Sequence, residues 1–197
     1  MQPGPTVGII AGAELVEQGR QYCTPGKGQC TVALSLACAT GGESINNINV
    51  GEFGMPVYAE CAGLMYLCRT IIRQGKRHEM VGAIPADVEL SNRPQGHGYV
   101  EVEATPENPL FDAGSVLRGH EFHHSKLIPL AALTFGYCVR RGHGVDGAMD
   151  GVCHGNVFAA YTHLHALGVP AWAERFVALA AMQTSQGLGA TISLYGG

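Results

Sequence analysis

The chain is poor in charge and in aromatic side chains, and it contains no long apolar run. Charged residues make up 14% of its 197 residues and aromatic residues 7%, and the net charge is −4 with His counted as neutral. This balance excludes the basic surface that nucleic-acid binding requires, so no nucleic-acid partner is expected. No apolar run approaches the roughly 20 residues that span a bilayer, and the N-terminus lacks the pattern of a signal peptide. We therefore expect no membrane contact and a cytoplasmic location.

Two further patterns are missing, a CxxC pair and a phosphate loop. Seven cysteines without such a pair or a secretion signal favour reduced thiols over a disulfide framework. The spacing of Cys and His does not fit a structural zinc site either, so no metal ligands are expected. The segment "TPGKGQ" lacks the spacing GxxxxGK[ST], so the chain offers no ATP-binding motif of this kind.

What the sequence does contain is a change of character near residue 55. Residues 1–54 are Gly-rich and irregular, whereas strand and helix patterns follow one another over 55–197. "MPVYA" predicts a buried strand, and "AGLMYLCRTII" has apolar residues at helical spacing. "PAWAERFVALAAMQ" predicts a closing helix with Pro170 in its first turn. We expect one α/β domain over 55–197, preceded by a divergent segment.

Cys61 stands where the predicted strand passes into the predicted helix. Such a strand–turn–helix junction lifts a side chain clear of the sheet and places it at a helix N-terminus, where unpaired N–H groups favour a thiolate. The backbone N–H of Ala62 is then suited to hold an oxyanion. Cys61 is therefore a candidate nucleophile, and the alternative is one buried cysteine among several.

A thiol nucleophile needs a base, and His163 is the leading candidate. It follows the apolar run "VFAAY", which predicts a strand ending beside the strand before Cys61, at the edge where sites form in parallel sheets. A satisfied structural histidine is the alternative for this position. The His-rich segment "GHEFHHS" reads either as a polar loop or as a border of the same pocket.

Three segments, "PVYAECAGLMYL", "GHEFHHS" and "GNVFAAYTHLH", resemble the signature segments of the glutamine amidotransferase domain of cobyrinic acid a,c-diamide synthases. The resemblance implies a flavodoxin-like class I amidotransferase domain, with a mostly parallel sheet flanked by helices. It implies that Cys61 is the nucleophile and that His163 raises its nucleophilicity. It also implies an active-site lining by three residues of the second segment: Glu121, His123 and Ser125.

The resemblance also concerns the acidic residue that follows the catalytic histidine in other triad amidotransferases. Leu164 and His165 stand in that place, as in the branch that lacks this third member. The sequence therefore predicts a catalytic pair without an acidic residue at that position.

The function implied by the resemblance is glutamine hydrolysis through a Cys thioester. The ammonia would serve ATP-dependent amidation of corrin carboxylates in cobalamin biosynthesis. ATP and Mg²⁺ would bind in a synthetase domain that this chain lacks, so the chain itself would carry no cofactor. The alternatives are a glutaminase for another tetrapyrrole amidase or cobyric acid synthase, a truncated inactive relic, and a thiol hydrolase of another type. The ending "YTHLH" rather than "YLHG" argues against cobyric acid synthase.

One stretch, residues 17–53, does not follow the family pattern. The family should have a Gly-Gly turn there that donates oxyanion N–H groups, and Gly41 and Gly42 are the candidates. The distance from "GGES" to the nucleophile strand is too short for the expected helix and its connections. We interpret this as a shifted reading frame or an altered segment, which resequencing of the coding DNA would test.

Overall fold

The computed structural model describes residues 8–10, 56–179 and 182. The oxyanion candidates Gly41 and Gly42 and the segment 17–53 lie outside these residues. Among the described residues, no helix has the length and apolar character needed to cross a membrane.

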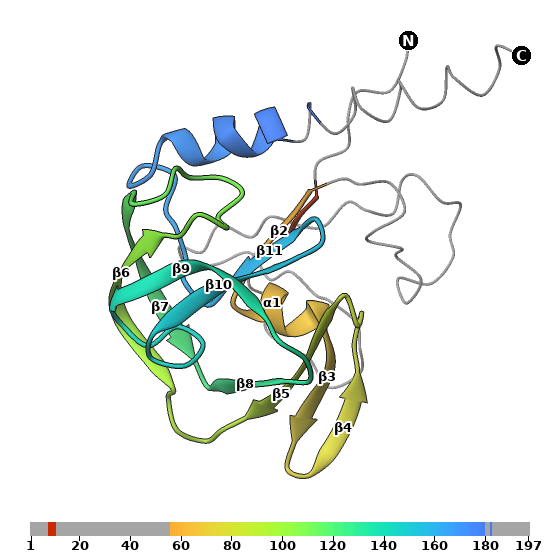
Figure 1. Cartoon of the computed structure of the whole chain (residues 1–197). Coiled ribbons are helices and arrows are strands. Elements are labelled where there is room, and N and C mark those ends of the chain that lie inside the picture. The colour runs from red at the N-terminus through yellow and green to blue at the C-terminus, as the bar shows by residue number, and fades with distance from the viewer. Residues whose placement is uncertain (1–7, 11–55, 180–181, 183–197) are drawn as a thin grey trace, which may run out of the picture.

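The main sheet of the described chain has seven strands, of which the central ones position the candidate site (Figure 1). Strand β2 pairs in parallel with β1 on one side and with β11 on the other. The remaining neighbours in this sheet run antiparallel. In spatial order the strands are β1 (Gly8–Ile10), β2 (Val57–Glu60), β11 (Val157–Ala160), β10 (Met149–His154), β9 (Thr134–Arg141), β6 (Gly96–Ala104) and β7 (Val116–His123).

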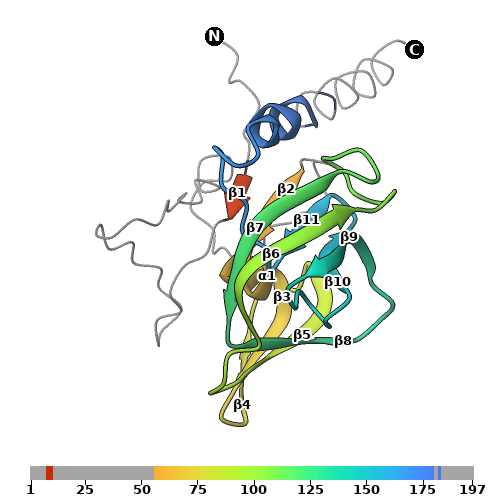
Figure 2. The same ribbon diagram turned by 90° about the vertical axis from the view of Figure 1, so that its left-hand side faces the viewer.

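A second sheet packs beyond the helix α1 (Ala62–Leu67), which contacts strands of both sheets. In both ribbon views this second sheet lies at the bottom of the molecule, with the long β6–β7 ribbon beside it (Figure 2). Its strand β3 pairs in parallel with β5, and its other pairs are antiparallel. In spatial order its strands are β4 (Lys76–Glu79), β3 (Cys68–Arg73), β5 (Ile84–Leu90) and β8 (Ser125–Pro129).

The helix predicted from "AGLMYLCRTII" is shorter than expected. It ends at Leu67, and the chain continues as strand β3. The β-branched run Thr70, Ile71 and Ile72 prefers a pleated strand, and pairing with β5 buries Thr70 and Ile71. Tertiary pairing therefore overrides the helical spacing of the apolar residues.

The α/β class is confirmed, but the expectation of a mostly parallel sheet flanked by helices needs correction. In the described chain, parallel pairing is limited to β1–β2, β2–β11 and β3–β5, and the other pairs are antiparallel. The helices described are α1 and the one over residues 171–179. Antiparallel ribbons such as β6–β7 tolerate one wet face, so they need no helix to cover it.

Two apolar clusters hold the fold together. One joins α1 to the second sheet and to the near face of β11, and includes Leu64 and Cys68. The other joins the far face of the main sheet to helix 171–179, through Tyr58, Trp172 and Phe176. Cys68 thus packs in the core, and the apolar face of the closing helix covers the main sheet. Each fully buried side chain of this size contributes about 1.5–3 kcal/mol.

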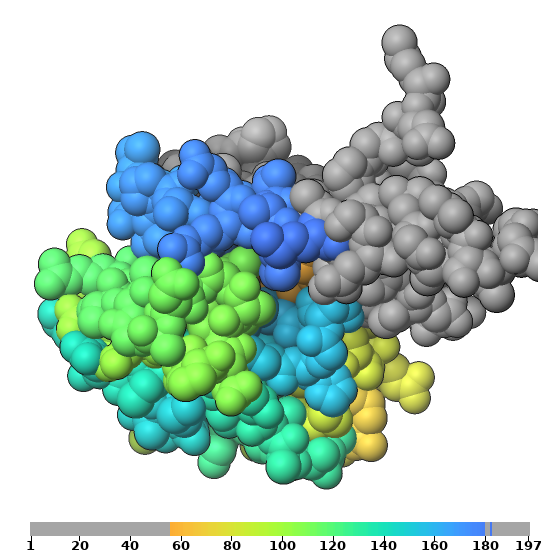
Figure 3. Space-filling model, turned by 45° about the horizontal axis from the view of Figure 1, so that its top comes forward, coloured from red at the N-terminus to blue at the C-terminus, as the bar shows by residue number. Residues whose placement is uncertain are grey.

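Helix 171–179 is also anchored to the loop between β6 and β7. Figure 3 shows the blue helix lying across this green loop. Arg175 donates hydrogen bonds to the carbonyl oxygen of Leu110 (3.0 Å) and to Asp112 (2.9 Å). Its guanidinium lies 5.8 Å from the centre of the Phe111 ring. The helix thereby closes the face of the sheet opposite to α1.

Candidate active site

Cys61 occupies the junction between β2 and α1 and has a strained backbone. Its φ is 48° and its ψ is −102°, in a region that residues with a Cβ rarely adopt. The Cys61 N–H donates to the carbonyl oxygen of Ala160 at 2.7 Å, and its own carbonyl accepts from Met65 at 3.1 Å. Strand β11 and the first helical turn thus hold the backbone in a sharp turn. Strain of about 1–3 kcal/mol at such a position is typical of a functional residue.

The Cys61 thiol is free and partly exposed. Its Sγ atom lies 3.6 Å from the carbonyl oxygen of Phe122 on β7. It also lies near enough to the imidazole of His163 to raise the pKa of that ring. The structure therefore brings together the two residues that the sequence predicts as nucleophile and base, although they lie far apart in the chain.

His163 is held in place by β7 through its backbone. Its N–H donates to the carbonyl oxygen of His120 at 2.8 Å, and the His120 N–H donates back at 3.1 Å. The two imidazole rings stack, with centres 4.9 Å apart and planes 12° apart. A Cβ at Gly119 would lie 2.2 Å from the His163 carbonyl oxygen, so the residue before His120 has to be glycine. This explains the "GH" at the start of "GHEFHHS".

A buried carboxylate fixes the chain just before His163. Asp150 on β10 is fully buried and accepts the N–H groups of Tyr161 (3.0 Å) and Thr162 (2.8 Å). It also accepts the Thr162 hydroxyl at 2.7 Å. Burial raises the pKa of Asp150, and the hydrogen bonds offset part of this rise. Asp150 therefore sets the path of the chain as it leaves β11.

Glu60 is the residue of the site that the sequence prediction missed. It ends β2, is 8% exposed, and places Oε2 3.2 Å from Nδ1 of His163. Its other oxygen, Oε1, accepts the Leu164 N–H at 3.0 Å and the Tyr58 hydroxyl at 2.7 Å. The available signal was a carboxylate at the carboxyl end of a buried strand, directly before the candidate nucleophile.

The pKa of His163 is set by its burial and by two neighbours, Cys61 and Glu60. Burial lowers the pKa of the imidazole, but hydrogen bonds and attraction to Cys61 and Glu60 outweigh burial and raise it to about 10. With this raised pKa the imidazole is protonated at neutral pH, so a thiol stands beside an imidazolium. Such a pair holds a nucleophile and a proton donor within one site.

Of the three residues expected to line the site, Glu121 and His123 lie on the buried face of β7, opposite to His120, and Ser125 begins β8. Glu121 accepts the backbone N–H groups of His143 (2.7 Å) and Gly144 (2.9 Å). Burial raises the pKa of Glu121, but His123 and these two N–H groups outweigh burial and lower it. Through the two backbone hydrogen bonds Glu121 fixes the turn that follows β9.

His123 and Ser125 contact Tyr161 rather than Cys61. The His123 ring stacks on the Tyr161 ring at 3.7 Å, and its Nδ1 bonds to the carbonyl oxygen of Ser125 at 3.0 Å. The Ser125 hydroxyl bonds to the Tyr161 hydroxyl at 2.8 Å. Through these contacts with Tyr161, His123 and Ser125 hold the segment that leads into His163. A direct part in lining the site, for these two residues and Glu121, stays a prediction.

Ala62 is the first residue of α1, so its N–H lies at the start of the helix directly after Cys61. The first N–H groups of a helix have no acceptor within it. The proposed oxyanion role of Ala62 is therefore compatible with its place in the fold, and it stays a prediction.

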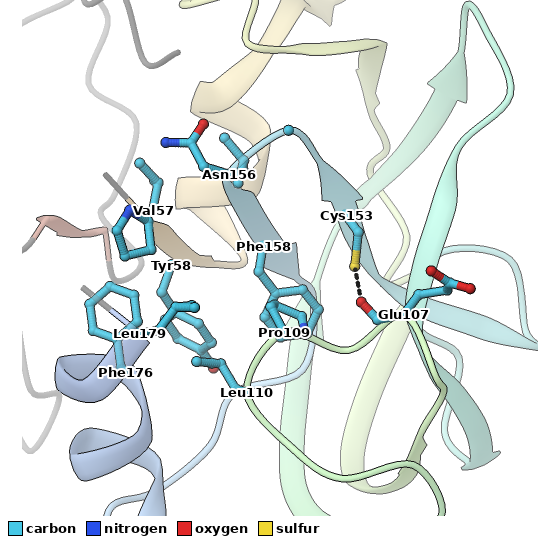
Figure 4. A pocket seen from close by; sticks show the side chains of 13 residues that line it. Val57, Tyr58, Glu107, Pro109, Leu110, Cys153, Asn156, Phe158, Phe176 and Leu179 are labelled. Atoms are coloured by element: carbon cyan, nitrogen blue, oxygen red, sulfur yellow. Dashed lines mark hydrogen bonds between the residues drawn. The ribbon is translucent and has the colours of Figure 1, made fainter. Parts of the chain in front are cut away.

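A cavity of about 150 Å³ lies at the opposite ends of β2 and β11. It lies where these strands begin, whereas Cys61 and His163 follow their ends (Figure 4). Cys153 borders it, with its Sγ 3.4 Å from the carbonyl oxygen of Glu107. The cavity is thus separate from the thiol and the imidazole. Its labelled lining residues are Val57, Tyr58, Glu107, Pro109, Leu110, Cys153, Asn156, Phe158, Phe176 and Leu179.

Comparison with known families assigns the chain. The sequence model of the CobB/CobQ-like glutamine amidotransferase domain matches residues 21–171, which is more than half of the chain. The chain belongs to this family of enzyme domains, which use glutamine as an amide donor. The family resemblance seen in the sequence is therefore confirmed. The matched range begins inside the segment 1–54, and the proposed boundary at residue 55 stays a prediction.

The chain is also similar to curated proteins that share one name. The chain is 45% identical over 123 residues to cobyrinate a,c-diamide synthase of Magnetococcus marinus, covering 62% of this chain and 26% of the relative. It is 39% identical over 123 residues to the synthase of Methanothermobacter thermautotrophicus, covering 62% and 27%. The chain thus spans about a quarter of the length of the curated relatives it matches.

Solved structures show weaker likeness. A crystal structure of a glutamine amidotransferase aligns with a TM-score of 0.45 and 17% identity, covering 64% of this chain and 61% of the other. A glutamine amidotransferase from Thermotoga maritima aligns with a TM-score of 0.37 and 16% identity, covering 62% and 47%.

Proposed function

We propose that this chain is the glutaminase part of a cobyrinate a,c-diamide synthase, and that Cys61 and His163 carry its chemistry. The observation that carries the proposal is the meeting of a thiol and an imidazole where β2 and β11 end, close enough for Cys61 to raise the pKa of His163. The strained backbone of Cys61 and the names of the curated relatives support it.

The mechanism begins with attack of the Cys61 thiolate on the side-chain amide carbon of glutamine. The carbonyl oxygen takes up negative charge, and the N–H of Ala62 stabilises this oxyanion. His163 then donates a proton to the leaving nitrogen, the C–N bond breaks, and ammonia departs. Water then attacks the remaining γ-glutamyl thioester while His163 takes up one of its protons; the C–S bond breaks, glutamate leaves, and the thiolate and the protonated imidazole are restored.

The ammonia then serves an amidation that this chain does not perform alone. In the proposed enzyme, a synthetase portion uses ATP and Mg²⁺ to activate side-chain carboxylates of a corrin substrate in cobalamin biosynthesis. The name shared by the relatives, and the quarter of their length that this chain covers, support this division of labour. Within the described residues, no group of three or more His, Cys, Asp or Glu side chains is arranged to hold a metal ion. A cytoplasmic location is part of the proposal.

Release of glutamate by the chain together with its synthetase portion tests the proposal. We expect Cys61→Ala to abolish glutamate release, because the nucleophile is gone. We expect His163→Ala to reduce the rate by at least about 100-fold, because general acid–base groups contribute roughly that much. Cys138→Ala is the matched control, since this thiol is free and exposed on β9. A glutamine-like affinity reagent should label Cys61 and leave Cys138 unlabelled.

The outcomes separate the alternative functions. Glutamate release with amidation of a tetrapyrrole other than a cobyrinate would assign the chain to another amidase. If the unmutated chain releases no glutamate and takes up no reagent, it is an inactive relic. Hydrolysis of other acyl groups without labelling would indicate a thiol hydrolase of another type.

A further inference from the structure

Glu60 has a role that extends the proposed function. In other triad amidotransferases an acidic residue follows the catalytic histidine, whereas Leu164 and His165 follow His163 here. The carboxylate that reaches the imidazole instead comes from the residue directly before the nucleophile. Its Oε2 lies 3.2 Å from Nδ1 of His163, and its side chain is 11% exposed.

This contact determines what the rest of the imidazole ring can do. A carboxylate that accepts from Nδ1 keeps a proton on that nitrogen and fixes the orientation of the ring. The other ring nitrogen is then left for the thiol of Cys61, which also contacts His163. The carboxylate on the last residue of β2 and the thiol on the residue after it therefore contact the imidazole at different nitrogens.

Glu60 is itself rigidly held. Its Oε1 accepts two further hydrogen bonds, from the Tyr58 hydroxyl and the Leu164 N–H. Tyr58 is 1% exposed, and its ring packs 5.2 Å from Trp172. Burial, and then the charge of Glu60, raises the pKa of Tyr58 well above 10, so the hydroxyl stays protonated and acts as a donor.

We propose that Glu60 is the positioning residue for His163. It takes the role of the acidic third member, although it stands directly before the nucleophile in the sequence. The proposal rests on the proposed function of Cys61 and His163. It goes beyond that function by assigning a residue whose place in the sequence differs from that of the usual third member.

Substitution of Glu60 by Gln, in the chain together with its synthetase portion, tests this role. The variant Glu60→Gln keeps the size of the side chain and an oxygen acceptor but removes the charge. We expect kcat for glutamate release to fall by about 100-fold or more, because loss of an orienting carboxylate costs up to about 10⁴-fold in a related geometry, while KM changes little. The pKa of His163, followed by NMR of the imidazole, should fall because its anionic partner is gone.

Two matched variants separate positioning from a structural role. Tyr58→Phe removes one hydrogen bond to Glu60 but leaves the carboxylate on His163, so kcat should fall by less than about 10-fold, as expected for one lost hydrogen bond. Glu60→Asp restores the charge on a shorter side chain, and we expect it to recover part of the activity and of the His163 pKa. If Glu60→Gln does not fold, the pH dependence of glutamate release by Glu60→Asp decides. A pH dependence equal to that of the unmutated protein overturns the proposal.

Other outcomes also decide. A Glu60→Gln variant with lower thermal stability but unchanged kcat and unchanged His163 pKa would show that Glu60 is only structural. If the unmutated protein releases no glutamate, the proposed function fails, but the NMR titration still reads the effect of Glu60 on His163. In that case a lowered pKa in Glu60→Gln supports positioning, and an unchanged pKa overturns it.

Discussion

The two ends of β2 and β11 differ in almost every physical respect, although the same strands form both. At their carboxyl ends stand a strained cysteine, an imidazole with a raised pKa and a buried carboxylate. At their amino ends lies a cavity walled mainly by aromatic and aliphatic side chains (Figure 4). The first end has converging polar groups and backbone strain, and the second has only a gap in the packing. A hollow alone therefore does not locate the chemistry in this molecule.

The difference has a cause in strand geometry. Alternation along β2 places Tyr58 and Glu60 on one side of the strand, so an aromatic ring can pack in the core while its hydroxyl reaches the site. The backbone turns sharply at Cys61, where the Cys61 N–H donates a hydrogen bond to the carbonyl oxygen of Ala160 on β11. At the carboxyl ends of β2 and β11, packed apolar side chains hold a few polar groups in place. At the amino ends the packed apolar side chains are present without those polar groups.

The largest expected effect comes from Gly119→Ala, which acts on the polar end through the backbone. The new Cβ would meet the His163 carbonyl oxygen at 2.2 Å and push His163 away from Cys61. A displacement near 1 Å costs about 100-fold in rate, so glutamate release should fall by that order. The measurement is the glutaminase rate, together with the thermal midpoint.

Gly147→Ala is the control for strain without displacement. Its φ is +90° and nothing lies within 4 Å of the added Cβ, so it should cost about 1 kcal/mol in stability and leave the rate unchanged. A fully active Gly119→Ala variant would contradict the view that β7 positions His163 by close backbone approach.

The sequence located the residues that meet at the candidate site better than it predicted the architecture around them. Cys61 and His163 could be found because a strand followed by a thiol, and a strand followed by an imidazole, are local patterns. The antiparallel pairings and the switch from helix to strand at Cys68 depend on partners distant in sequence, as β5 is for β3. Glu60 was missed because a carboxylate at a strand end is usually solvated, and its burial comes from Tyr58 and Leu164. The supporting role of Asp150 likewise depends on backbone groups 11 and 12 residues away.

Asp150→Asn tests the support of the polar end with an intermediate effect. The carboxylate accepts two backbone N–H groups and a hydroxyl through its two oxygens, and an amide offers only one oxygen. Leaving buried donors unpaired should lower the free energy of unfolding by about 2–4 kcal/mol, measured by urea titration. The glutaminase rate should also fall, because Tyr161 and Thr162 lead into His163. A variant as stable as the unmutated chain would show that this buried carboxylate is not needed to hold the strand end.

Cys153→Ala should have the smallest effect and sharpens the comparison from the apolar end. Burial raises the pKa of this thiol to about 11, so it stays protonated at neutral pH and donates weakly to the Glu107 carbonyl oxygen. Removing it should cost less than about 1.5 kcal/mol, since it deletes one weak hydrogen bond and a little packing. The glutaminase rate should remain unchanged, and thiol-directed labelling at neutral pH should favour Cys61 over Cys153. A loss of activity comparable to that of Cys61→Ala would mean that the cavity takes part in the reaction, and the two ends of these strands would then have to be treated as one site.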